Sequence, residues 1–304
     1  MKDINFRGVF TAMITPFTKK DFLDEDMLEQ IVEAQIASGV SGLVPCGTTG
    51  ESPTLSHDEH DRVIALTVKF ANGRVPVIAG TGSNATSEAI RLSRHAQEVG
   101  SDAVLLVNPY YNKPTQKGLY LHFKAIADSV DIPCILYNIK GRTGVNIETA
   151  TVRALSEACP NIGGVKEASG DLEQMKSVIA ETHGAFRVLS GDDNLCLDLI
   201  EAGGDGVISV GSNICPRYIS DMVSMALGGD MKGARAMEAT LAGFFKANFL
   251  ETNPIPIKSA MARYGWCEES FRLPMCTFEH EENRVKLYAE LDKLDALGAL
   301  TRRI

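Results

Sequence analysis

The sequence lacks the long apolar and basic segments that are typical of membrane proteins and nucleic-acid-binding proteins. No apolar run approaches the roughly 20 residues that a membrane-spanning helix needs, and the first residues, MKDINFRGVF, contain no apolar stretch of signal-peptide length. Acidic residues outnumber basic ones, 39 to 30, and no basic cluster interrupts the net charge of -9. We therefore expect a cytoplasmic protein that binds neither nucleic acid nor a membrane surface.

Closely spaced cysteine pairs are also missing. The 304 residues contain seven cysteines, an odd number, and no C-x-x-C pair. They are Cys46, Cys134, Cys159, Cys196, Cys215, Cys267 and Cys276. Scattered cysteines in a protein expected to be cytoplasmic indicate free, buried thiols rather than disulfides or a zinc site.

Common cofactor motifs are incomplete. Gly80–Gly82 has no third glycine in register and no P-loop lysine follows it, which disfavours nucleotide binding. His57 and His60 are one residue closer than the histidines of H-E-x-x-H and are typical of a polar helix face. Glu51 and Asp192–Asp193 could bind a metal, but no histidine follows a predicted strand. We expect neither a metal nor an organic cofactor.

Short β-branched runs recur along the first two thirds of the chain. They are apolar on both faces, as parallel strands covered by helices are, and eight of them can be counted. The runs begin at Val9, Gly42, Val75, Ala103, Pro133, Ile162, Phe186 and Gly206. Amphipathic stretches of helical period separate them, often opened by Asp, Ser or Thr and closed by Gly.

The short connections between these units favour a closed barrel over an open, doubly wound sheet. Eight strand-helix units in about 200 residues predict an α/β fold, the (β/α)8 TIM barrel. From Pro216 onward the chain has only helical patterns. We predict a barrel over residues 1–215 and an appended C-terminal helical region over residues 216–304, packed on the barrel or on a partner subunit.

A lysine follows the sixth predicted strand, where barrel enzymes place their chemistry. Lys166 stands beside Glu167 at the end of an apolar, glycine-rich run, and hydroxyl groups dominate the other strand ends. A buried, neutral lysine can form an imine with a ketone or aldehyde, which acts as an electron sink for carbon-carbon chemistry. A solvated lysine in a loop is the alternative that position alone leaves open.

Seven motifs in order and spacing resemble the dihydrodipicolinate synthase family of pyruvate-dependent class I aldolases. The motifs are GTTGES from Gly47, PYYNKPTQ from Pro109, YNIKGRTG from Tyr137, KEASGD from Lys166, SGDD from Ser190, GVISV from Gly206 and NPIPIK from Asn253. The resemblance covers essentially the whole chain. It implies a lyase that condenses pyruvate with L-aspartate 4-semialdehyde in the diaminopimelate and lysine pathway, with no cofactor.

The resemblance also implies catalytic roles for individual residues. Lys166 matches the lysine that forms a Schiff base with pyruvate. Thr48, Tyr137 and Tyr111 match the proton relay, and the tyrosine at 111 reaches the site from a neighbouring subunit of a homotetramer. Thr49 matches the contact to the pyruvate carboxylate.

The resemblance at further positions favours the semialdehyde as the second substrate. Arg142 matches the arginine that binds the semialdehyde carboxylate, and Gly191 and Ile208 match positions that line the site through their backbone. The related N-acetylneuraminate lyases typically have G-S-T-G-E in the first motif and lack this arginine. A guanidinium suits a short substrate with a carboxylate. A sugar-acid aldolase, a metal-dependent aldolase and a barrel that has lost catalysis are the remaining alternatives.

The resemblance further implies feedback inhibition by L-lysine at a subunit interface. The matching positions are Ser52, His57, His60, Asn84, Glu88 and Tyr110. We expect Glu88 to pair with the effector's ammonium group and His60 to line the pocket. Two residues depart from the family's pattern. Pro53 replaces a small residue at the effector site, and Lys140 replaces a proline in the loop that carries Arg142.

Overall fold

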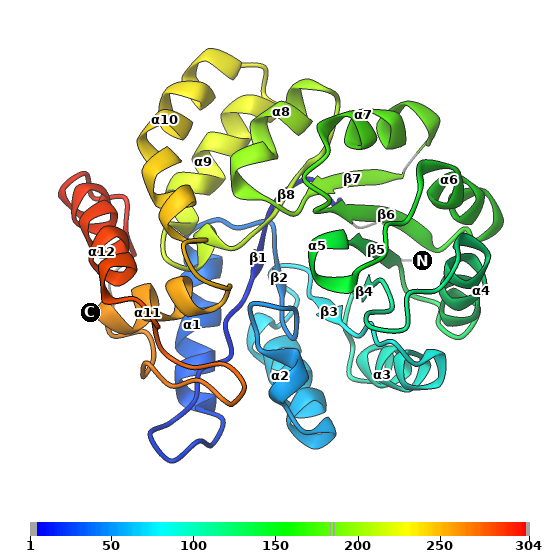
Figure 1. Ribbon diagram of the computed structural model, residues 1–304, viewed down its shortest axis with the longest axis horizontal. Helices are drawn as coiled ribbons and strands as arrows, with labels where there is room; N and C mark the ends of the chain where they lie inside the picture. The colour runs from blue at the N-terminus through cyan, green and yellow to red at the C-terminus, as the bar shows by residue number, and fades with distance from the viewer. Residues whose placement is uncertain (1–4, 183, 185, 302–304) are drawn as a thin grey trace.

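The computed structural model describes residues 5–182, 184 and 186–301, and its core is a barrel of parallel strands (Figure 1). The strands are β1 (Gly8–Ala12), β2 (Gly42–Val44), β3 (Ile78–Gly80), β4 (Ala103–Val107), β5 (Cys134–Asn138), β6 (Ile162–Glu167), β7 (Arg187–Ser190) and β8 (Gly206–Ser209). Their order is β2-β1-β8-β7-β6-β5-β4-β3, and a parallel bridge between Leu43 and Val77 joins the two ends of the sheet. The predicted TIM barrel is confirmed.

Helices follow the strands, and most of them cover the outside of the barrel. They are α1 (Glu25–Ala37), α2 (His57–Ala71), α3 (Thr86–Glu98), α4 (Gln116–Ala127), α5 (Lys140–Thr143), α6 (Thr149–Ala158), α7 (Leu172–Glu181) and α8 (Cys196–Glu201). Several begin at side chains that accept backbone N–H groups. Ser56 and Glu59 form a capping box at the start of α2, and Asp171 caps α7.

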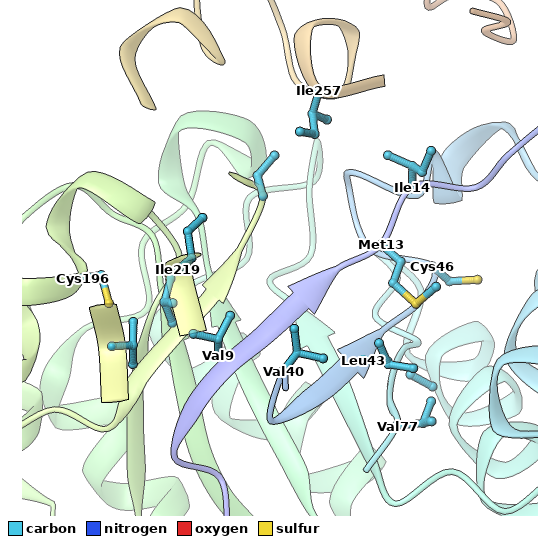
Figure 2. Packing of buried hydrophobic residues seen from close by; sticks show 14 of the residues in the cluster. Val9, Met13, Ile14, Val40, Leu43, Cys46, Val77, Cys196, Ile219 and Ile257 are labelled. Atoms are coloured by element: carbon cyan, nitrogen blue, oxygen red, sulfur yellow. The ribbon is translucent and has the colours of Figure 1, made fainter. Parts of the chain in front are cut away.

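Apolar side chains pack in two layers, one inside the barrel and one between the strands and the helices. The inner layer includes Phe10, Ile78, Ile135 and Ile208. Figure 2 shows part of the outer layer, with Ile219 beside Val9 of β1. Because both faces of each strand are buried, the strands have the continuous apolar runs by which they are recognised in the sequence.

The C-terminal helices gather beside the part of the barrel that contains β1 and β8 (Figure 1). They are α9 (Pro216–Leu227), α10 (Met231–Ala247), α11 (Ile255–Arg263) and α12 (Glu281–Ala296). Helix α9 packs on β1, while α10 packs on α9 and α12. One apolar cluster runs from the barrel wall into these helices. The division of the chain after residue 215 stays a proposal.

The cysteines are all free thiols, as predicted, but not all of them are buried. Cys267 is half-buried and Cys276 is exposed, which corrects the expectation for these two. Burial raises the pKa of the Cys134 thiol to about 12, so it stays protonated at neutral pH. Within the described residues, no helix combines the length and the apolar character needed to span a bilayer.

Candidate active site

Lys166 and Tyr137 lie side by side at the carboxyl ends of β6 and β5. The two residues are partners in the strand register, and each is 5% exposed. The Lys166 Nζ atom lies 4.2 Å from the centroid of the Tyr137 ring. Lys166 is therefore not a solvated loop residue but a buried amine that contacts an aromatic side chain. That side chain belongs to Tyr137, the tyrosine that the motifs pair with this lysine.

Gly191 leaves room beside this lysine. A Cβ atom at position 191 would lie 2.4 Å from the Ala168 Cβ and 3.0 Å from the Lys166 Cε. Any side chain here would therefore press on the lysine stem or on the loop that follows β6. Ile208 on β8 is fully buried in the inner layer. Gly191 thus adjoins Lys166, and Ile208 belongs to the same apolar cluster as Tyr137, while their roles toward a substrate stay proposals.

Thr48 and Thr49 lie in a tight turn after β2. The backbone N–H of Gly50 donates to the Gly47 carbonyl at 3.1 Å, and that of Glu51 donates to the Thr48 carbonyl at 3.1 Å. The Thr15 hydroxyl donates to the Gly50 carbonyl at 2.6 Å. These bonds hold the turn on the barrel mouth, and both threonines are thereby fixed near the strand ends.

Arg142 lies on the short helix α5, which follows β5. Its side chain is exposed, and its Nη2 donates to the Asn253 carbonyl at 3.0 Å. The helix ends at Gly144, whose φ of +74° lies in the left-handed region that favours glycine. Lys140 begins the same helix and is exposed as well.

One cavity of about 390 Å³ joins two of the four catalytic candidates to five of the six effector candidates, and Lys166 is not among its lining residues. Its lining includes the catalytic candidates Thr48 and Tyr137 and the substrate candidate Arg142. It also includes most of the effector candidates, together with the residue that departs from the family's pattern: Ser52, His57, His60, Glu88, Tyr110 and Pro53. Part of the predicted catalytic site and most of the predicted effector site therefore border one cavity within a single subunit.

Glu88 is the anionic centre of the effector half of this cavity. His57 Nε2 and Glu88 Oε1 are 2.8 Å apart, and the Ser83 hydroxyl donates to Glu88 Oε2. The Ser83 hydrogen bond, with a further one from His57, lowers the pKa of the Glu88 carboxyl, so it stays ionised at neutral pH. Asn84 lies beside this region, where its carbonyl accepts from Asn112 Nδ2 at 2.9 Å.

His60 is buried and donates from Nε2 to the Gly80 carbonyl at 3.0 Å. Its Nδ1 has no hydrogen-bond partner among the described residues, and the nearest carboxylate oxygen, Asp61 Oδ1, is 3.9 Å away. Burial lowers the pKa of this imidazole, so the ring is neutral at pH 7. His60 therefore lines the cavity as a neutral ring with a free acceptor nitrogen.

Tyr111 is the one catalytic candidate that points to solvent. Its side chain is 88% exposed, its φ is +71°, and it does not line the cavity. Tyr110 is also exposed, at the edge of the cavity. A single subunit therefore does not bring Tyr111 to Lys166, and its predicted role requires the site of a second subunit.

The structure adds a buried ion pair that sequence reasoning missed. Lys258 Nζ lies 2.5 Å from Glu51 Oε1, and both side chains are almost fully buried. Lys258 Nζ also lies 4.2 Å from the centroid of the Phe17 ring. Glu51, considered above as a possible metal ligand, is thus occupied by a lysine. No group of three or more His, Cys, Asp or Glu side chains suited to hold a metal occurs within the described ranges.

Glu167 serves the loop after β6. It is fully buried and accepts hydrogen bonds from the Asn138 amide at 3.1 Å, the Gln174 amide at 3.0 Å and the Ser169 N–H at 2.9 Å. The Asn108 amide extends this network by donating to Asn138 at 2.9 Å. These bonds fix the end of β6 on which Lys166 lies, and they satisfy a carboxylate that would otherwise be costly to bury.

The sequence pattern of this chain is that of a known protein family. The pattern of the Dihydrodipicolinate synthetase family (DHDPS) matches residues 5–293. A protein from Endomicrobium trichonymphae named 4-hydroxy-tetrahydrodipicolinate synthase is 55% identical over 283 residues, which cover 93% of this chain and 96% of the relative.

Solved structures of the same family superpose on the whole fold. The chloride-inhibited dihydrodipicolinate synthase from Acinetobacter baumannii, complexed with pyruvate, is 43% identical with a TM-score of 0.92, over 95% of this chain and 99% of that chain. The DHDPS from Cyanidioschyzon merolae with lysine bound is 37% identical with a TM-score of 0.92, over 95% and 98%. This chain therefore belongs to the dihydrodipicolinate synthetase family and is an enzyme of that family.

Proposed function

We propose that this enzyme condenses pyruvate with L-aspartate 4-semialdehyde to give 4-hydroxy-tetrahydrodipicolinate, through a Schiff base on Lys166. The observation that carries the proposal is the buried contact between the Lys166 amine and the Tyr137 ring at the barrel mouth. Membership of the family supports a pyruvate-dependent condensation in the lysine and diaminopimelate pathway. The structure of the Acinetobacter baumannii relative with pyruvate supports the first substrate.

The proposed reaction gives each of these residues a defined step. The neutral Lys166 amine attacks the pyruvate ketone, and water leaves as the imine forms. A proton then leaves the methyl group, and the resulting enamine attacks the aldehyde carbon of the second substrate, whose oxygen takes up a proton to become the 4-hydroxyl group. The amino group of the semialdehyde then attacks the imine carbon, which closes the ring and releases the Lys166 amine. Tyr137 and Thr48 transfer these protons within one subunit, and Tyr111 of a neighbouring subunit completes the relay. The 88% exposure of Tyr111 supports this sharing between subunits of a homotetramer.

Arg142 favours the semialdehyde over a sugar acid as the second substrate. Its guanidinium lies on the cavity wall, and one of its nitrogens is held by the Asn253 carbonyl. The remaining N–H groups of a guanidinium can bind a carboxylate through two parallel hydrogen bonds. A sugar substrate that presents hydroxyl groups at this point would gain less from such a charge.

Replacement of this arginine should affect one substrate selectively. We expect Arg142→Ala to lower kcat/KM for the semialdehyde by roughly 10²-fold, because a charged hydrogen-bonding pair is lost. The KM for pyruvate should stay within about threefold. Steady-state kinetics with each substrate varied in turn measures both values.

The exposed neighbour Lys140, on the same short helix, provides the matched control. Lys140→Ala changes the local charge equally but should leave both KM values near those of the wild type. An Arg142→Ala enzyme that condenses the semialdehyde at full efficiency would contradict this assignment. A wild type that prefers a sugar-derived aldehyde over the semialdehyde would favour the sugar-acid aldolase instead.

We also propose that L-lysine inhibits the enzyme from the effector half of the cavity. Glu88 is an ionised carboxylate suited to the ammonium group of lysine. His57 is in contact with it, and the neutral His60 lines the same cavity. The lysine-bound relative from Cyanidioschyzon merolae supports the choice of effector. Pro53 lies exposed on the same wall, and its side chain offers the effector no hydrogen bond there.

Titration with lysine tests the regulatory proposal. Millimolar L-lysine should inhibit the wild type, and Glu88→Gln should raise the half-inhibitory concentration about tenfold or more, since the ammonium group loses its ionised partner. Each variant is compared with its own rate without lysine. Glu98→Gln, an exposed glutamate at the end of the same helix, is the control and should leave inhibition intact. Undiminished activity of the wild type at millimolar lysine would remove the proposal.

A further inference from the structure

The segment that leads into α11 contacts both halves of the proposed substrate site. The Asn253 side chain donates from Nδ2 to the Thr49 hydroxyl oxygen at 3.1 Å. The backbone carbonyl of the same residue accepts from Arg142 Nη2 at 3.0 Å. Asn253 and Thr49 are both buried. One residue from the C-terminal region thus holds the predicted pyruvate contact through its side chain and the predicted semialdehyde contact through its backbone.

The direction of the first hydrogen bond matters for the chemistry of Thr49. A threonine hydroxyl has one proton to donate and two lone pairs that accept. Because the Asn253 amide donates to the Thr49 oxygen, the hydroxyl proton stays available for another partner. A carboxylate can only accept hydrogen bonds. The bond from Asn253 therefore prepares Thr49 to donate to the carboxylate of a bound 2-oxo acid.

The buried ion pair fixes the far end of the same turn to α11. Lys258 lies on α11, and its partner Glu51 ends the turn that carries Thr49. The other oxygen of this carboxylate, Oε2, accepts from the Arg272 N–H at 3.2 Å. The turn is thus attached to the C-terminal region at two points, residues 49 and 51. This double attachment limits the movement of the Thr49 hydroxyl relative to Arg142.

We propose that Asn253 is a positioning residue for pyruvate recognition. Asn253 acts through Thr49. Its amide donates to the Thr49 oxygen, which leaves the hydroxyl proton free to bind the substrate carboxylate, while the Lys258–Glu51 pair holds α11 and the turn together. The inference rests on the proposed function, because it takes Thr49 as the contact to pyruvate. It adds a determinant of pyruvate affinity that lies outside the barrel strands and loops.

Two substitutions at this position distinguish the direction of the hydrogen bond. Asn253→Ala removes the donor and should raise the pyruvate KM about tenfold, the effect of one lost hydrogen bond to a group that binds a charged ligand. Asn253→Asp places an acceptor opposite Thr49, captures the hydroxyl proton and adds a negative charge, so it should raise this KM more than alanine does. The semialdehyde KM should change by less than about threefold, because the backbone carbonyl remains.

Asn248 supplies a matched control for the loss of a buried asparagine. It is fully buried at the end of α10, and neither atom of its side-chain amide has a hydrogen-bond partner among the described residues. Asn248→Ala should leave the pyruvate KM at the wild-type value. An equal rise in this variant would mean that Asn253 contributes only general stability, which would overturn the proposal.

A double substitution tests whether Asn253 acts through Thr49. In a Thr49→Val background the hydroxyl is already absent, so adding Asn253→Ala should raise the pyruvate KM no further. Independent, multiplying effects would overturn the positioning role. Thr49→Val alone removes the acceptor of the same hydrogen bond and should also raise the pyruvate KM. The test therefore holds even if one asparagine variant folds poorly.

Trapping of the imine separates failure of this inference from failure of the proposed function. Wild-type enzyme is incubated with a range of pyruvate concentrations and reduced with borohydride, and the labelled fraction of Lys166 is measured by peptide mass spectrometry. Half-maximal labelling should require about tenfold more pyruvate in Asn253→Ala. Unlabelled wild type would refute the proposed function itself. Labelled wild type with an unchanged half-maximal concentration in the variant would refute only the role of Asn253.

Discussion

Lys166→Ala should reduce turnover by roughly 10³-fold or more, because the variant has no amine with which to form the imine. The fold should survive, since alanine at the end of β6 removes a side chain without burying a new charge. Condensation of pyruvate with the semialdehyde is followed under saturating concentrations of both substrates. A thermal unfolding midpoint close to that of the wild type confirms that the loss is chemical.

A second lysine serves as control for this expectation. Lys176 lies on the exposed face of α7, where it pairs with Glu173. Lys176→Ala removes an equal charge from the same part of the chain and should keep wild-type turnover. Substantial activity in Lys166→Ala, beyond what contaminating enzyme explains, would show that the reaction does not pass through this amine. A reaction that a chelator then abolishes would point to the metal-dependent aldolase.

Lys258→Met should cause the largest loss of stability among single substitutions in the C-terminal region. Lys258 has no exposed side-chain surface and lies 2.5 Å from Glu51, so its removal leaves a buried carboxylate without its cation. Breaking a buried pair in this way costs about 3–5 kcal/mol of unfolding free energy. Burial lowers the pKa of Lys258, which shows that desolvation opposes the charge even with its partner present.

Removing both charges separates the cost of the pair from the cost of an orphan charge. The double variant Glu51→Gln, Lys258→Met should recover a large part of the lost stability, because no buried charge is left unpaired. Thermal unfolding of the two single variants and the double variant gives the comparison. Lys176→Met, in an exposed pair, should leave the midpoint almost unchanged. A Lys258→Met protein as stable as the wild type would contradict the role assigned to the pair.

The strands could be predicted because each is buried on both faces and therefore reads as a continuous apolar run. Prediction was less accurate at the ends of the runs. The run that begins at Val75 contains Pro76, which has no N–H to donate to a sheet, and β3 covers only Ile78–Gly80. The carboxyl ends of β5 and β6 could be located closely, because Tyr137 and Lys166 interrupt the apolar runs just before these strands end.

The contacts across the site could not be predicted from local patterns. Glu51 and Lys258 are 207 residues apart, and no local pattern identifies either residue as the partner of the other. The motif NPIPIK attracted notice through the resemblance alone, and the position of Asn253 between Thr49 and Arg142 depends on how α11 packs over the barrel. A lysine in an otherwise apolar helix was the one signal that a buried partner was required.

The connection between the two halves of the cavity could not be predicted from the sequence either. His57 and Glu88 lie on different helices, and Thr48 lies on a turn near both, so their common cavity arises only when α2 and α3 pack beside each other. A separate catalytic site and effector site were expected. Because both groups of residues line one cavity, an effector bound there would lie near Tyr137 and the turn at Thr48.

The most direct test of the account is the mapping of a reduced pyruvate adduct. The enzyme is incubated with pyruvate alone and reduced with borohydride, and its peptides are analysed by mass spectrometry. We predict a single modification on Lys166, absent without pyruvate and absent from Lys166→Ala. A folded, oligomeric enzyme that carries no adduct, or carries it on a different lysine, would contradict the central claim that the buried Lys166 amine is the reacting group.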